Sequence, residues 1–183
     1  MLMEQLFSSG LMQMGPSRND AGRQVGVFNP GAVGDFPALR SRKMEEFRWM
    51  AGEWNYENLV PAGRVNPAYS DIGRCRYSFC EKGNWISIVA PDGRETPHIT
   101  FDPFSRQWIY LLMNGAYGIL RSQDGWHQNQ IAFTGLMTMI GFNCEWRMRW
   151  TKKGEDRFSF INEERDADGG WAYIDEWHFT RAG

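Results

Sequence analysis

Apolar and polar residues alternate along most of the chain after residue 53. In the clearest run, residues 142–150, apolar and polar side chains take turns: Phe142, Asn143, Cys144, Glu145, Trp146, Arg147, Met148, Arg149 and Trp150. A period of two puts the apolar set on one face of a β-strand. Comparable runs predict strands near 53–60, 71–80, 84–90, 95–102, 106–113, 116–122, 126–134, 142–151, 156–163 and 171–180.

Short turn signals separate these runs. Asp92-Gly93, Asn114-Gly115 and Asp124-Gly125 are typical of tight hairpins, because Gly and Asn adopt the positive φ that such turns need. Consecutive antiparallel strands with short turns avoid exposed edges by closing on themselves. The pattern therefore predicts an all-β fold, a single up-and-down antiparallel β-barrel of about ten strands.

Two other patterns precede the strands. Residues 38–51 contain strong helix formers and no internal Gly or Pro, and Gly52 follows, so one short helix is expected. Residues 1–37 are rich in Gly, Pro, Asn and Ser and predict an irregular leader. Within it, Met1 to Met14 is either a short amphipathic helix or a loosely held tail. The expected domains are thus the leader, 1–37, and the barrel, 38–183.

Charge and cysteine usage exclude several classes of protein. The net charge is −2 with both signs interspersed, which argues against a nucleic-acid partner. No apolar run approaches the length of a membrane span, so no membrane partner is expected. The three cysteines, Cys75, Cys80 and Cys144, form no C-x-x-C pair and favour a reducing, cytoplasmic location.

The two ends of the strand region carry a family resemblance. Gly52-Glu53-Trp54 resembles the G-x-W signature of lipocalins and fatty-acid-binding proteins, and His178-Phe179-Thr180-Arg181 resembles the end of their last strand. The stretch from about 45 to 182 resembles an uncharacterised bacterial branch of this calycin superfamily, a domain of unknown function. The resemblance implies a calycin-like barrel around a small ligand. It also implies that Arg181 stacks on Trp54 to close the barrel, a structural role.

The aromatic content, 15%, is high, and a barrel would direct much of it inward. With the apolar face of each strand inside, the expected ligand-binding residues are Tyr56, Tyr77, Phe79, Phe101, Trp108, Tyr110, Phe133, Trp146, Met148, Phe160, Asn162, Tyr173 and Trp177. The alternative is a solid aromatic core.

One carboxylate interrupts the aromatic face of the last strand. Strict alternation places Asp175 between Tyr173 and Trp177, and a buried carboxylate needs a partner or a raised pKa. Asp175, with Asn162, is therefore a candidate to orient a ligand hydroxyl or amine, or to act as a catalytic acid or base. The alternative is a structural hydrogen bond to a Tyr or Arg.

The histidines suggest no metal centre. His98, His127 and His178 form no metal-ligand spacing, so neither a metal nor a cofactor is expected. Alternation places His98 and His127 on outer faces. Some calycins bind haem through one His near the last strand, which makes His178 an alternative haem ligand, although alternation puts it opposite the Asp175 face.

Two apolar stretches point to contacts. Residues 108–113 are apolar on both faces, so a second subunit in a homodimer or the leader is expected to cover the outside. Residues 135–141 are either a flexible flap over a ligand portal or continuous strand.

Three functions compete. The first is binding of a small hydrophobic or aromatic molecule inside the barrel. The second is a cofactor-independent enzyme, such as an isomerase, cyclase or hydrolase, that uses the carboxylate of Asp175. The third is a structural or interaction barrel without a ligand. The sequence leaves open whether the protein is an enzyme.

Overall fold

The computed structural model describes residues 12–18, 24–28, 35–63, 67–113 and 115–183, and the chain divides into two compact units, Met1–Leu39 and Arg40–Gly183. In the first unit, β1 (Met12–Arg18) pairs antiparallel with β2 (Gln24–Phe28). The expected irregular leader is corrected here, because Gly and Pro hide the period of this hairpin. Of the segment proposed as a helix, Met12–Met14 lies in β1 and residues 1–11 fall outside the described part.

A helical segment leads into the strands. Helix α3 (Phe36–Met44) continues into the 3₁₀ helix η1 (Glu45–Met50). The predicted helix is confirmed, but its second half is wound more tightly. Met44, Phe47 and Met50 are all buried, and their spacing of three residues aligns them on one face of a 3₁₀ helix.

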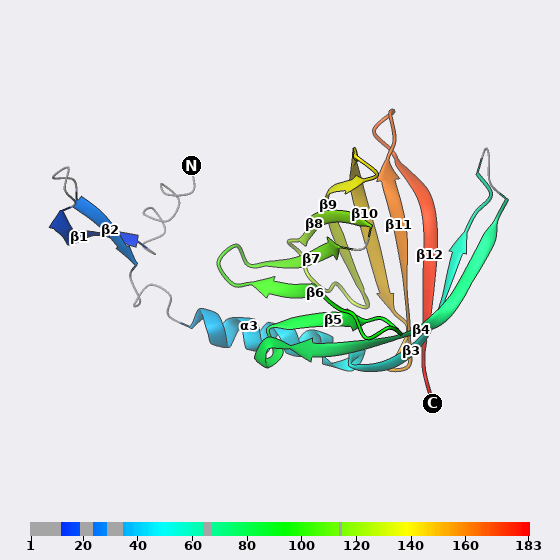
Figure 1. Ribbon diagram of the computed structural model, residues 1–183, viewed down its shortest axis with the longest axis horizontal. Coiled ribbons are helices and arrows are strands. Elements are labelled where there is room, and N and C mark those ends of the chain that lie inside the picture. The colour runs from blue at the N-terminus through cyan, green and yellow to red at the C-terminus, as the bar shows by residue number, and fades with distance from the viewer. Residues whose placement is uncertain (1–11, 19–23, 29–34, 64–66, 114) are drawn as a thin grey trace. The chain divides into compact units, whose positions relative to one another are not determined.

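Ten antiparallel strands form a closed barrel (Figure 1). They are β3 (Gly52–Val60), β4 (Tyr69–Cys80), β5 (Trp85–Val89), β6 (Glu95–Asp102), β7 (Gln107–Met113), β8 (Ala116–Ser122), β9 (Gln130–Met139), β10 (Phe142–Lys152), β11 (Arg157–Arg165) and β12 (Trp171–Arg181). Each strand pairs with the next, and β12 pairs with β3, which closes the sheet. The predicted up-and-down barrel is confirmed.

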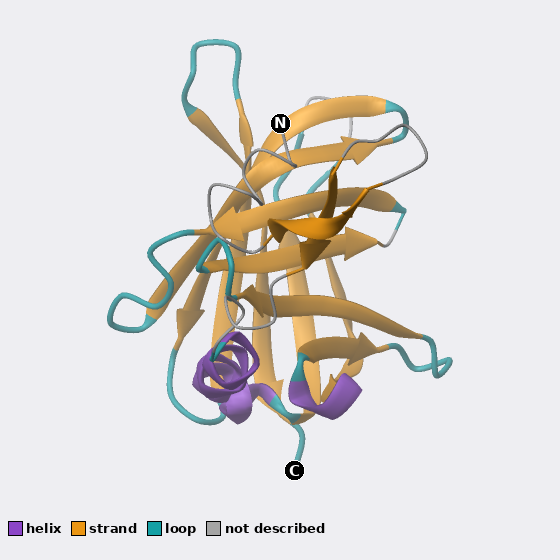
Figure 2. Ribbon diagram, turned by 90° about the vertical axis from the view of Figure 1, so that its left-hand side faces the viewer, coloured by secondary structure: helices purple, strands orange, loops and turns teal. Residues whose placement is uncertain are grey.

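The two ends of the barrel differ. The helical segments η1 and η2 (Glu81–Gly83) and the C terminus lie at one end, which we call the helix end (Figure 2). The turns after β3, β5, β7, β9 and β11 lie at the other, which we call the opposite end. No helix among the described residues is long and apolar enough to cross a membrane.

Strand β9 begins and ends later than predicted. Its backbone is paired to β8 and to β10 as far as Met139, so 135–139 is strand and the alternative of a flexible flap is wrong. Glycines at two positions make this possible. A Cβ at Gly118 would lie 2.6 Å from the Leu136 carbonyl oxygen, and one at Gly135 would overlap the Ile119 carbonyl oxygen.

A β-bulge in β12 reverses one predicted face. Asn162 pairs with Asp175 and Glu163 pairs with Tyr173, which leaves Ile174 as an extra residue. Tyr173 therefore shares the outer face with Glu163 and is 46% exposed. Its predicted place in the ligand-lining set is wrong, because strict alternation fails wherever one residue is inserted.

A second bulge, in β6, turns His98 inward. Ile99 pairs with Ile86 and Pro97 pairs with Ser87, so His98 is the extra residue. It is only 6% exposed, and its ring lies 5.5 Å from that of Tyr110. His98 was predicted to face outward, and that prediction is wrong. As for Tyr173, the reason is a bulge, which interrupts the strict alternation of faces.

Aromatic side chains occupy the interior near the helix end. Phe158 stacks on Phe179 with ring centres 4.2 Å apart, and Trp150 stacks on Phe158 at 5.5 Å. Trp54 meets the edge of Phe158 at 4.9 Å. Close-packed rings of this kind stabilise the barrel through burial and directional aromatic contacts. This half of the barrel is therefore largely core.

Arg181 ties the last strand to the first at the helix end. Its guanidinium lies 4.3 Å from the centre of the Trp54 ring. Its nitrogens donate to the carbonyl oxygens of Trp49 at 2.6 Å, Ala51 at 3.0 Å and Glu155 at 3.0 Å. One side chain thus joins η1, the β10–β11 turn and β12.

Candidate ligand-binding site

Polar and aromatic side chains share the inner face of the barrel toward the opposite end. Asn162 of β11 pairs directly with Asp175 of β12, and Trp177 pairs with Asn58 of β3. Trp146 of β10 lies on the same inner face and contacts Asn162. We call these five residues the Asp175 cluster.

Hydrogen bonds hold the Asp175 cluster in one arrangement. The Asn162 amide nitrogen donates to Asp175 Oδ1 at 2.7 Å. The Trp146 indole nitrogen donates to Asn162 Oδ1 at 3.1 Å. Asn162 therefore uses both ends of its amide, which fixes its orientation and presents its N–H to the carboxylate.

Burial makes the Asp175 carboxylate costly to ionise. Desolvation raises the pKa of Asp175, and hydrogen bonds from Asn162 and Trp177 partly offset that rise. Within the described part of the chain, no cation contributes to this pKa. Asp175 is nevertheless only partly buried, so part of its side chain stays accessible.

Tyr56 extends the aromatic wall beside the cluster. Its ring lies 5.3 Å from that of Trp177 and runs along β4 across Gly73. A Cβ at Gly73 would lie 2.5 Å from the Tyr56 hydroxyl, so the glycine makes room for the ring. Trp177 and Tyr56 are half-buried and form an apolar surface next to a carboxylate.

Several buried polar atoms on the inner face have no hydrogen-bond partner among the described residues. They are Asn58 Oδ1, Tyr77 Oη and Trp150 Nε1. Burial raises the pKa of Tyr77 well above its ordinary value, so its hydroxyl stays protonated. Each buried polar group without a partner lowers the stability of the fold by about 1–3 kcal/mol. Apolar side chains would avoid this cost, so the interior is more polar than packing alone requires.

The predicted ligand-binding residues that face inward divide into three groups. Tyr56, Trp146, Asn162 and Trp177 belong to the wall at the Asp175 cluster, and Met148 pairs with Asn162. Tyr77, Tyr110, Phe133 and Phe160 lie deeper, in contact with the aromatic core. The other three lie at the helix end. Arg48 lies over the Phe79 ring, Lys43 lies over the Phe101 ring, and Phe47 contacts the Trp108 ring.

His178 lies on the outer face. It pairs in register with Glu57 and Ser159, and its Nε2 lies 3.5 Å from Glu176. It therefore does not reach the Asp175 cluster. Among the described residues, no three His, Cys, Asp or Glu side chains are grouped as metal ligands would be.

Sequence reasoning missed two inner-face residues. Asn58 follows Trp54 and Tyr56 at a spacing of two, so alternation alone could have found it. His98 required knowledge of the bulge. The adjacent Pro97 was a signal, because proline within a strand is found at edges and bulges.

Comparison with known proteins adds little. No protein-family model and no curated protein matches the chain. Solved structures that match include a protein of unknown function from the DUF3598 family of Nostoc punctiforme, at 13% identity and a TM-score of 0.40, covering 74% of this chain and 49% of that one. This chain thus spans about half the length of the Nostoc protein.

Two further barrels match at similar levels. A redesigned β-barrel has 11% identity and a TM-score of 0.35 over 74% of this chain and 94% of its own. Rv2717c of M. tuberculosis has 8% identity and a TM-score of 0.43, and the match covers 77% of this chain and 98% of that one. Similarity at this level identifies no function. The closed antiparallel barrel itself is consistent with the calycin resemblance of the sequence.

Proposed function

We propose that the barrel binds one small molecule with an apolar or aromatic body and a hydroxyl or amine group, in the half around the Asp175 cluster. The observation that carries this proposal is the carboxylate of Asp175, held by Asn162 on an aromatic inner wall without a cation as partner. A ligand N–H or O–H would be a further donor beside Asn162 and Trp177, and the Trp177 ring would pack on the ligand body.

The energetics favour a donor rather than an anion. A hydrogen bond to a charged group contributes about 1.5–3 kcal/mol, and the partly buried position of Asp175 limits competition from water. A second negative charge beside Asp175 would be repelled in the same environment. The site should therefore select neutral or cationic donors over anions of the same shape.

A second candidate function rests on the raised pKa of Asp175. Desolvation raises the pKa of Asp175, which makes its carboxylate a stronger base than an exposed one and suits it to act as a general base. An isomerase, cyclase or hydrolase without a cofactor would use Asp175 in this way. Turnover of a bound compound, lost in Asp175→Asn while binding is retained, would favour the enzyme over the carrier.

Two fluorescent probes with the same aromatic body test the binding proposal. N-phenyl-1-naphthylamine carries an N–H donor, and 8-anilinonaphthalene-1-sulfonate adds only a sulfonate. We expect the amine to bind the full chain more tightly than the sulfonate. Asp175→Asn should reduce the ratio of the two dissociation constants by about tenfold, because the anionic carboxylate is gone.

The neighbouring residue gives a matched control. Glu176→Gln removes a carboxylate one position away on the outer face, and the ratio should stay at the wild-type value. Lowering the pH through the pKa of Asp175 should shrink the wild-type ratio in the same direction as Asp175→Asn. Absence of one-to-one binding, or equal effects of the two variants, would instead favour a filled barrel without a ligand.

The natural ligand can be sought directly. Native and denaturing mass spectra of protein purified from its own host would reveal a bound mass that is lost on denaturation. We expect a neutral or cationic compound with at least one N–H or O–H group. A reproducibly bound anion would contradict the proposed selectivity.

A further inference from the structure

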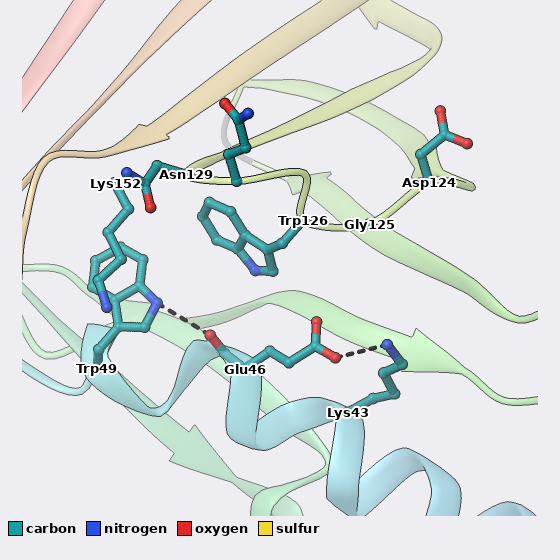
Figure 3. A pocket seen from close by; sticks show the side chains of 9 residues that line it. Lys43, Glu46, Trp49, Asp124, Gly125, Trp126, Asn129 and Lys152 are labelled. Atoms are coloured by element: carbon teal, nitrogen blue, oxygen red, sulfur yellow. Dashed lines mark hydrogen bonds and ion pairs between the residues drawn. The ribbon is translucent and has the colours of Figure 1, made fainter.

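A concave site of about 460 Å³ lies at the helix end, apart from the Asp175 cluster (Figure 3). One wall comes from the helical segment, with Lys43, Glu46 and Trp49. The facing wall is the loop between β8 and β9, which contributes Asp124 and Trp126 among others. The volume falls in the range of about 300–1,000 Å³ that is common for small-molecule sites.

Two indole rings form the apolar part of this site. The ring centres of Trp49 and Trp126 are 6.1 Å apart with their planes at 66°. Phe47 supports Trp126 at 5.1 Å, and Phe158 supports Trp49 at 5.5 Å. Both rings are thus fixed from behind by the core, so they present preformed surfaces to the pocket.

The two indole N–H groups differ. Trp49 Nε1 donates to the Glu46 carbonyl oxygen at 3.1 Å. Trp126 Nε1 is buried and has no hydrogen-bond partner among the described residues. This nitrogen is enclosed, so a ligand in the pocket would contact the face of the Trp126 ring and not its N–H.

Both lysines that line the pocket are already paired. Lys43 pairs with Glu46 at 2.7 Å, and Lys152 pairs with Glu155 at 2.7 Å. Lys152 also lies 4.8 Å from the centre of the Trp49 ring. An anionic ligand would therefore find no unpaired ammonium, and a cationic ligand would be repelled from the Trp49 face that Lys152 occupies.

The remaining polar groups suit hydroxyls. Asp124 forms no ion pair among the described residues and offers carboxylate acceptors. Gln128 and Asn129 line the pocket with amides, each of which both donates and accepts. A hydroxyl also does both, so it can satisfy either kind of group.

We propose that this pocket binds a neutral carbohydrate of one or two sugar rings. A sugar ring has an apolar C–H face that packs on an indole and an edge of hydroxyls that donate and accept hydrogen bonds. The Trp126 ring offers the first surface, and Asp124, Gln128 and Asn129 offer the second, while Lys43 and Lys152 are already paired. This proposal does not depend on a ligand inside the barrel.

Fluorine NMR of the full chain labelled with 5-fluorotryptophan tests the proposal. Trp49→Phe and Trp126→Phe assign the two pocket resonances. The probes are glucose, galactose, N-acetylglucosamine, maltose and cellobiose at millimolar concentrations. We expect at least one of them to shift the Trp49 and Trp126 resonances saturably, while the resonance of Trp177, inside the barrel, stays in place.

Two mild variants should weaken the binding of that saccharide by about tenfold. Asp124→Asn removes the free carboxylate, and Trp126→Phe reduces the aromatic surface in the pocket but keeps a ring against Phe47. Trp171→Phe is the matched control, because Trp171 lies against Arg147 and Arg165 on the outer face of the barrel. It should leave the affinity unchanged.

Other outcomes would overturn the proposal. If no saccharide shifts the two pocket resonances, the pocket is not a carbohydrate site. If inorganic phosphate or tetramethylammonium shifts them instead, the pocket selects an anion or a cation and not a neutral sugar. Equal weakening by Asp124→Asn and Trp171→Phe would show that the saccharide binds elsewhere.

Discussion

His98 shows how one buried side chain links the fold to pH. Burial lowers the pKa of His98 to about 4, and a hydrogen bond with the Leu111 carbonyl oxygen, at 3.2 Å, partly opposes that change. The folded protein therefore keeps His98 neutral at pH values where the unfolded chain protonates it. Because the unfolded state then binds more protons, stability falls as the pH drops from about 6.5 to about 4.

We expect His98→Gln to flatten this dependence. Wild-type protein should lose up to about 3 kcal/mol of unfolding free energy across that pH interval through His98. Urea unfolding followed by fluorescence at several pH values measures this loss. His127→Gln is the control, because His127 is exposed, and it should keep the wild-type slope. An unchanged slope in His98→Gln would show that other groups cause it.

At the scale of elements, two glycines set how closely β8 and β9 approach. A Cβ at Gly135 would overlap the Ile119 carbonyl oxygen of the neighbouring strand, and a backbone atom cannot move aside as a side chain can. Gly135→Ala should therefore lower the unfolding free energy by about 1–3 kcal/mol, the usual cost of overpacking.

Chemical denaturation of Gly135→Ala tests this close approach. Thr134→Ala, an exposed position one residue away, is the comparison and should change stability by less than about 0.5 kcal/mol. A stable Gly135→Ala would mean that the two strands can separate locally without cost to the barrel.

At the scale of the whole molecule, the contacts of Arg181 hold the barrel closed at the helix end. Its planar guanidinium stacks on Trp54 and donates to three carbonyl oxygens and to the Asp156 carboxylate. A lysine ammonium keeps the charge but cannot donate in the same plane to all of these acceptors. Arg181→Lys should therefore cost about 2 kcal/mol or more of unfolding free energy.

Arg157→Lys is the matched control for that substitution. Arg157 is an exposed residue of β11 that pairs with Thr180, and its replacement should be nearly neutral. Thermal and urea unfolding of both variants give the comparison. Equal stability of the two would mean that the contacts of Arg181 do not hold the barrel closed.

The sequence by itself determined the ten strands of the barrel and its closure, but not the β1–β2 hairpin. Alternation such as that of 142–150 reports which side chains must leave water, and short turns leave few ways to connect ten antiparallel strands. It also placed Asp175, Asn162 and Trp177 on one inner face, because the alternation of β12 holds from Asp175 to Arg181.

Only the tertiary structure decided the faces beyond each bulge and the sites built from distant segments. Ile174 and His98 are inserted residues, and an insertion of one reverses every face beyond it without any change in composition. The pocket at the helix end joins Trp49 to Trp126, which the sequence predicts to lie in a helix and in a distant strand. Contacts between residues so far apart depend on how the sheet closes, which local periodicity does not encode.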